Sequence, residues 1–183
     1  MSFGKETLLR RLKELEDDAA APARFVVAFS GGLDSSVLLH ALASNREQAG
    51  VPITAVHIDH GLHEDSASWQ QHCESFATSF DVEFASERAS VDPESGAGPE
   101  AAAREARYAA LRGYIGKNDW LLSAHHEDDQ AETLLLNLMR GSGPAGLAGI
   151  RAVRRFADGW LVRPLLDVSR GELEAYASMH ALA

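Results

Sequence analysis

A short loop of small residues follows an apolar stretch near the start of the chain. Residues 25–29 read Phe-Val-Val-Ala-Phe, and residues 30–36 continue as Ser-Gly-Gly-Leu-Asp-Ser-Ser. The two adjacent glycines, Gly31 and Gly32, let a backbone bend tightly and approach a ligand closely. The helix expected after them offers unpaired N–H groups and the positive end of its dipole, which suits a phosphate group. The sequence therefore predicts a phosphate-binding loop at residues 30–36.

This loop differs from the phosphate loop of kinases and GTPases. That motif requires Gly-x4-Gly-Lys followed by Ser or Thr, and the chain contains no such string. The alternative interpretation is an ordinary strand-to-helix turn whose helix is capped by Asp34. We favour the ligand-binding interpretation because Ser-Gly-Gly-x-Asp-Ser after an apolar strand is a specific string.

Two further polar clusters follow apolar stretches. Asp59 and His60 come after residues 53–58, and His125, His126 and Asp129 come after residues 120–124. In a parallel sheet, the carboxyl ends of the strands meet at one edge, where such folds bind ligands. We therefore expect these clusters and the predicted phosphate loop to surround one crevice, and our hypothesis is that this crevice holds ATP.

The chemistry that these groups suit is adenylation, in which a substrate oxygen attacks the α-phosphorus of ATP and pyrophosphate leaves. Negative charge grows on the phosphates, and N–H groups, Mg²⁺ and arginine stabilise it. Asp34 and Asp129 are the candidate Mg²⁺ ligands because this ion prefers hard oxygen donors. His125 or His126 could move a proton or contact phosphate, and the sequence does not choose between them.

Arginines on a predicted helix supply a further candidate for phosphate binding. Arg104 and Arg107 lie three residues apart, so one helix face could present both to the crevice. An exposed ion pair between Glu100 and Arg104 is the alternative. Asp129 also has an alternative role as a helix cap, because Glu132 follows it at capping-box spacing.

The elements that must position these residues alternate between strand and helix. This alternation predicts an α/β fold with an open parallel sheet, helices on both faces and right-handed crossovers. A hairpin around Asp158-Gly159 is expected near the C-terminus, and Ser169 and Glu172 have capping-box spacing. The predicted helices cover residues 5–17, 35–49, 66–80, 99–116, 128–140 and 169 onward, and the predicted strands cover residues 25–29, 53–58, 82–85, 120–124, 151–156 and 160–163.

Composition restricts the class of protein. The 183 residues carry a net charge of −10, so tight binding of a nucleic acid would need a local patch. Arg151, Arg154, Arg155 and Arg163 form such a cluster in the sequence, although a solvated hairpin is the alternative.

The single cysteine, Cys73, excludes a disulfide framework within the chain. No apolar run is long enough to cross a membrane and no secretory segment is present, so the cytoplasm is the expected location.

The motifs together resemble a known family. The string Ser30-Gly-Gly-Leu-Asp-Ser35 resembles the pyrophosphate-loop (PP-loop) signature of the N-type ATP pyrophosphatases, whose fold is Rossmann-like (adenine nucleotide alpha hydrolase-like). Longer strings resemble the tRNA(Ile)-lysidine synthetase branch of that family. They are Val56-His-Ile-Asp-His-Gly-Leu62, Arg104-Glu-Ala-Arg-Tyr108, Ala124-His-His-Glu-Asp-Asp-Gln-Ala-Glu-Thr133, Arg140-Gly-Ser-Gly143 with Gly146-Leu-Ala-Gly149, and Arg163-Pro-Leu-Leu166.

The resemblance implies an ATP- and Mg²⁺-dependent ligase. Such an enzyme adenylates the wobble cytidine of tRNA(Ile) with a CAU anticodon, and L-lysine then displaces AMP to form lysidine, so that the tRNA reads AUA instead of AUG. It also implies a catalytic domain at residues 1–168 and, at residues 169–183, a helix that begins a linker to further domains. Dimerisation is left open. By match to the motifs, the ATP-binding residues would be Ser30, Gly31, Gly32, Leu33, Asp34 and Ser35, with Asp59 and His60 beside them, and the reaction site would comprise Asp34, Arg104, Arg107, His125, His126 and Asp129.

Three other functions fit parts of the pattern. A sulfur-transferring tRNA enzyme of related fold would depend on cysteine pairs, whereas this chain has only Cys73. A metal phosphoesterase could use the His and Asp clusters without a glycine loop. A non-catalytic nucleotide-binding module would bind ATP and never release pyrophosphate.

Overall fold

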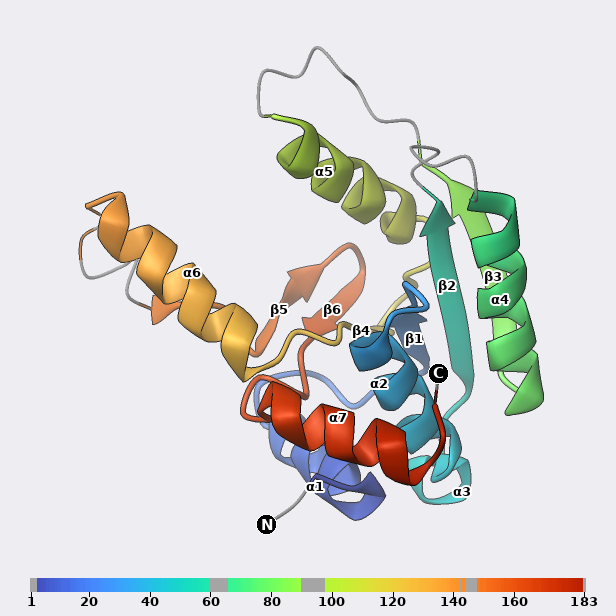
Figure 1. The fold of residues 1–183 in the computed structure, drawn as a ribbon. Coiled ribbons are helices and arrows are strands. Elements are labelled where there is room, and N and C mark those ends of the chain that lie inside the picture. Colours follow the sequence, from blue (N-terminus) through green and yellow to red (C-terminus); the bar gives the residue numbers. More distant parts are fainter. Residues whose placement is uncertain (1–2, 60–65, 90–97, 142, 144–147, 183) are drawn as a thin grey trace.

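A six-stranded sheet forms the centre of the molecule (Figure 1). The computed structural model describes residues 3–59, 66–89, 98–141, 143 and 148–182. The strands lie in the order β3-β2-β1-β4-β6-β5; the first five are parallel, and β5 runs antiparallel to β6. Their bounds are β1 Phe25–Ala28, β2 Ile53–Asp59, β3 Glu83–Arg88, β4 Trp120–Leu122, β5 Val153–Phe156 and β6 Gly159–Val162.

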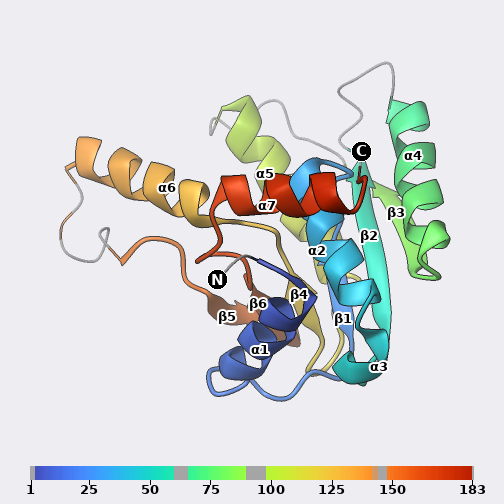
Figure 2. The same cartoon turned by 60° about the horizontal axis from the view of Figure 1, so that its bottom comes forward.

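Helices cover both faces of the sheet, which confirms the predicted fold class (Figures 1 and 2). One face carries α1 (Lys5–Leu15), α2 (Leu33–Ala43), α4 (Ser66–Ser79) and α7 (Arg170–Met179), whose buried residues share a core with β1 and β4. The other face carries α5 (Pro99–Arg112), where Leu111 packs among Val26, Leu121 and Leu161. Apolar burial on both faces of the central strands explains why residues 25–28 read as an uninterrupted apolar run.

Several element boundaries differ from the sequence prediction. The helix expected at residues 35–49 is two helices, α2 and the short α3 (Arg46–Ala49), because the chain turns at Asn45, whose side-chain amide donates to the Ala41 carbonyl. The hairpin turns at Ala157-Asp158 and not at Asp158-Gly159. Gly159 is instead the first residue of β6, where a Cβ would collide with the Asp119 carbonyl. Strand β3 extends to Arg88, and α5 ends at Arg112.

Two helices near the C-terminus differ in how they pack. Helix α6 (Glu127–Met139) projects from the body of the molecule in both views, and none of its residues is buried (Figures 1 and 2). Helix α7 begins with the predicted capping box of Ser169 and Glu172 and packs on α2.

The domain boundary at residue 168 stays a prediction. Within the described part of the chain, every helix is too short or too polar to cross a bilayer.

Candidate active site

A cavity of about 650 Å³ opens at the carboxyl ends of β1, β2 and β4. The parallel register of these strands brings their C-terminal loops to one edge, as expected for this sheet type. The cavity therefore unites the three polar clusters that the sequence singled out. The predicted site residues among its lining are Ser30, Gly32, Asp34, Ser35, Asp59, Arg107, His125 and Asp129.

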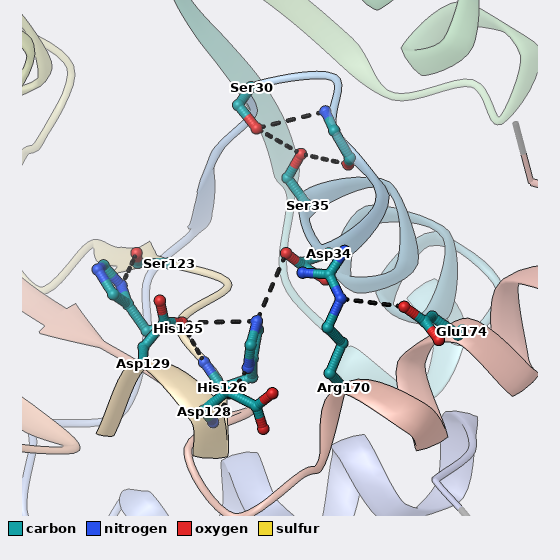
Figure 3. A network of polar contacts seen from close by, with 11 residues as sticks. Ser30, Asp34, Ser35, Ser123, His125, His126, Asp128, Asp129, Arg170 and Glu174 are labelled. Atoms are coloured by element: carbon teal, nitrogen blue, oxygen red, sulfur yellow. Dashed lines mark hydrogen bonds and ion pairs between the residues drawn. The ribbon is translucent and has the colours of Figure 1, made fainter. Parts of the chain in front are cut away.

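The loop after β1 owes its shape to Gly31. This residue has φ +79°, in the left-handed region that favours glycine. A Cβ at Gly31 would lie 2.6 Å from the buried Sγ of Cys73 on α4. The loop is closed from within, because the Ser35 hydroxyl donates to the Gly32 carbonyl at 3.0 Å and lies 3.0 Å from the Ser30 hydroxyl (Figure 3). These contacts hold residues 30–35 in a compact turn.

Helix α2 starts directly from this turn. Its N-cap is Gly32, so no side chain caps the helix, and the alternative prediction of an Asp34 cap is wrong. Asp34 lies instead in the first turn of the helix, and its buried Oδ1 has no hydrogen-bond partner. An uncapped helix N-terminus beside a cavity presents backbone N–H groups to an anion.

Trp69 supports the same loop from outside, which the sequence gave no signal to predict. The indole Nε1 on α4 donates to the Ser30 carbonyl at 2.8 Å. The ring also lies 3.2 Å from the position that a Cβ at Gly31 would occupy. Trp69 and Cys73 therefore together support the loop at Gly31. Trp69 is half-exposed and lines the cavity.

His126 stands between the two predicted metal ligands (Figure 3). It is the N-cap of α6, where its Nδ1 accepts a hydrogen bond from the Asp128 N–H at 3.3 Å. In the neutral ring the proton is therefore on Nε2, which lies 3.7 Å from both Asp34 Oδ2 and Asp129 Oδ2. Asp129 Oδ2 in turn accepts from the His126 backbone N–H at 2.8 Å. Asp129 thus belongs to a capping box with His126 and not, as the alternative had it, with Glu132.

His125 points elsewhere, although it is the next residue. It lines the cavity, and its Nδ1 lies 2.7 Å from the Ser123 hydroxyl (Figure 3). Burial, reinforced by the positive charges of Arg163, Arg104 and Arg107, lowers the pKa of His125 to about 4. Its ring is therefore neutral at pH 7, so it acts in the cavity as a neutral hydrogen-bonding group.

Arginines enclose the side of the cavity formed by α5. Arg107 lines the cavity, and burial lowers the pKa of its guanidinium, with a smaller effect from the charge of Arg104. Both guanidinium carbons lie over the Tyr108 ring, at 5.5 Å for Arg104 and 5.7 Å for Arg107. Arg104 and Arg107 therefore share one face of α5, although Arg107 lines the cavity and Arg104 does not. The Glu100 side chain, which would form the alternative ion pair, lies outside the described side chains.

Some predicted residues do not line the cavity. Gly31 and Leu33 lie in the loop and at the start of α2, and Arg104 and His126 are likewise not among the lining residues. His60 lies outside the described residues.

Lining residues that the sequence analysis missed include Trp69, Tyr108 and Ser123. Ser123 follows β4 directly, so its place at the strand end was the available signal for it.

The fold and this site define a class of protein, the PP-loop domain. Residues 5–183 match the model of that family. The chain belongs to this family. Among curated proteins, it is 49% identical over 178 residues to the tRNA(Ile)-lysidine synthase of Alkalilimnicola ehrlichii, covering 97% of this chain and 39% of that protein. It is 46% identical over 173 residues to that of Proteus mirabilis, covering 93% and 39%. The chain thus spans about two fifths of the length of the relatives it matches.

Solved structures of other proteins share the fold. The U34-tRNA thiolase NcsA of Methanococcus maripaludis matches with a TM-score of 0.76 at 19% identity, covering 97% of this chain and 63% of that one. The NMN synthetase of Francisella tularensis matches with a TM-score of 0.61 at 14% identity, covering 99% and 72%.

Proposed function

We propose that this chain is the catalytic domain of a tRNA(Ile)-lysidine synthase. The C2 oxygen of the wobble cytidine of tRNA(Ile) attacks the α-phosphorus of ATP, and the bond from that phosphorus to the bridging oxygen of pyrophosphate breaks. The amine of lysine then attacks C2, and AMP leaves. The observation that carries this proposal is the cavity in which the glycine loop, two aspartates and a neutral histidine meet, in a chain 46–49% identical to synthases of that name.

The loop and α2 are assigned to the triphosphate. Backbone N–H groups at the uncapped start of α2 and the Arg107 guanidinium approach the cavity from different elements. Negative charge that develops as pyrophosphate leaves is stabilised by such fixed donors. Ser30 and Ser35, whose hydroxyls already contact each other, line the same end.

Asp34 and Asp129 are the proposed Mg²⁺ ligands. The fit rests on the unpartnered, buried Asp34 Oδ1 and on the hard oxygen donors that both carboxylates supply. Among the described residues, no three His, Cys, Asp or Glu side chains are placed to hold a metal ion, so phosphate and water oxygens would complete the coordination. The ion would neutralise phosphate charge. His126 Nε2 lies 3.7 Å from one carboxylate oxygen of each proposed ligand, between the two side chains.

Asp129→Asn tests this assignment, and Asp128→Asn is a matched control on the same turn of α6. Asp128 is exposed, and its side chain does not line the cavity. We expect Asp129→Asn to lower the rate of isotopic pyrophosphate exchange, measured with tRNA(Ile) and lysine, on the order of a hundredfold, and Asp128→Asn to leave it unchanged.

Two outcomes would count against the proposal. Equal exchange by both variants would remove Asp129 from the reaction. Exchange that persists when the wobble cytidine is replaced by uridine would remove that cytidine as the acceptor of the adenylyl group.

A further inference from the structure

Four arginines gather around one pair of aromatic rings beside the cavity. Tyr108 and Phe156 contact edge to face, with ring centroids 5.7 Å apart. Arg104 and Arg107 approach Tyr108, Arg112 lies 5.1 Å from the Phe156 centroid, and Arg154 lies 5.7 Å from both centroids. We call Arg104, Arg107, Arg112 and Arg154 the arginine cluster.

Among the described side chains, no ion pair neutralises the positive charge of this cluster. Burial lowers the pKa of Arg107, and the nearby charge of Arg104 adds a smaller effect in the same direction. The chain as a whole carries a net charge of −10, so the cluster is a local positive surface on an acidic molecule. Such a surface attracts and orients a polyanion.

The cluster also continues the cavity outward. Arg107 and Tyr108 line the cavity, while Arg104, Arg112 and Arg154 are exposed. The surface therefore leads from the cavity along α5 to the edge strand β5. A nucleotide that reacts within the cavity stays joined to its neighbours, so the flanking backbone must leave by some such path. Arginine binds phosphate oxygens and stacks on unpaired bases.

From these observations we propose that the three exposed members of the arginine cluster, Arg104, Arg112 and Arg154, bind the RNA strand that flanks the reacting nucleotide. This inference rests on the proposed function and adds to it the surface that holds the RNA. It also divides the arginines of the hairpin, which the sequence grouped together. Arg154 belongs to the RNA surface, whereas its neighbour Arg155 does not.

The division follows from the geometry of β5. Successive side chains of a strand point to opposite faces of the sheet. Arg154 accordingly faces Tyr108 and Phe156, while Arg155 lies 4.2 Å from the centroid of Trp160, a ring that packs against the core of the opposite face. Both arginines are exposed and carry the same charge, so each is the control for the other.

The experiment measures RNA affinity of this chain by fluorescence anisotropy. A labelled anticodon stem-loop of tRNA(Ile) with the CAU anticodon is titrated at several salt concentrations with the unaltered chain, Arg154→Ala, Arg155→Ala and Arg154→Lys. We expect Arg154→Ala to weaken binding about three- to tenfold and to reduce the slope of log affinity against log salt by about 0.7–1. Arg155→Ala should change neither quantity, and Arg154→Lys should restore the slope.

Affinity for an ATP analogue, measured in parallel, separates this inference from the function on which it rests. Equal loss in Arg154→Ala and Arg155→Ala, loss in neither, or no RNA binding by the unaltered chain at low salt would overturn the RNA surface. A loss of ATP affinity in Arg154→Ala without loss of RNA affinity would overturn it in favour of a triphosphate subsite. Failure of the unaltered chain to bind the ATP analogue, with the RNA results as expected, would contradict the proposed function alone.

Discussion

Two neighbouring histidines have different surroundings, and therefore different chemistry. The ring of His126 caps α6 through Nδ1 and turns Nε2 to two carboxylates, whereas the ring of His125 enters the cavity beside Ser123. The sequence could place both near the site because they follow a buried strand. It could not separate them, because the backbone at the start of α6 decides which ring becomes the cap.

The pKa of His125 gives a prediction at the residue scale. Burial holds this pKa at about 4 in the folded chain, against about 6.5 for an unperturbed histidine. Between these values the unfolded chain binds a proton that the folded chain does not. The resulting contribution to stability is complete above about pH 6.5 and is lost as the pH falls towards 4. The free energy of unfolding should therefore decline over this range.

The prediction is measured by urea unfolding at a series of pH values with the unaltered chain and His125→Gln. The decline should be shallower in the variant, though not absent, because burial also lowers the pKa of His40. Identical pH profiles, or an NMR titration of His125 with a midpoint near 6.5, would contradict a buried, neutral ring.

At the scale of elements, the phosphate loop depends on a helix distant from it in sequence. Helix α4 provides Cys73 beneath Gly31 and the indole of Trp69 beside the Ser30 carbonyl. The loop and the alternation of strands and helices could be predicted from local patterns. The support from α4 could not, because it results from the packing of residues about forty positions apart.

Gly31→Ala tests the packing of the loop against Cys73 and Trp69, and Gly32→Ala is the matched control. An alanine at Gly31 must adopt the left-handed region at a cost of about 1–2 kcal/mol and must also displace Cys73. At Gly32, φ is −78° and a Cβ would lie 3.6 Å from Ser30 Oγ, an ordinary contact. We expect Gly31→Ala to lower the melting temperature by about 2–8 °C, with little change for Gly32→Ala. Equal melting temperatures in calorimetry would contradict the account of the loop.

Helix boundaries show where local patterns were insufficient. The prediction joined α2 and α3 into one helix over residues 35–49, yet the Asn45 side chain donates to the Ala41 carbonyl and the helix ends there. The alternative in which Asp129 caps α6 with Glu132 matches a capping box by spacing, but His126 is the N-cap and Asp129 is its N3 partner. The capping box of Ser169 and Glu172 was predicted correctly, because both residue types and their spacing match the motif.

At the scale of the whole molecule, the sheet topology brings the site residues together, and positively charged arginines lie beside the site. Five parallel strands bring distant loops to one edge, as the strand and helix pattern predicted. The total charge indicated an acidic protein, but it could not reveal that arginines from α5 and β5 converge on Tyr108 and Phe156. That convergence depends on the pairing of β5 with β6 at the sheet edge.

The central claim is that the turn at residues 30–36 holds the phosphates of ATP. A crystal structure of the chain with a non-hydrolysable ATP analogue and Mg²⁺ tests it most directly. The account predicts that the phosphates lie at the start of α2, within reach of the backbone N–H groups after Ser30, and that the ion contacts Asp34. A nucleotide bound away from this turn, or a turn left empty at a saturating concentration of the analogue, would contradict it.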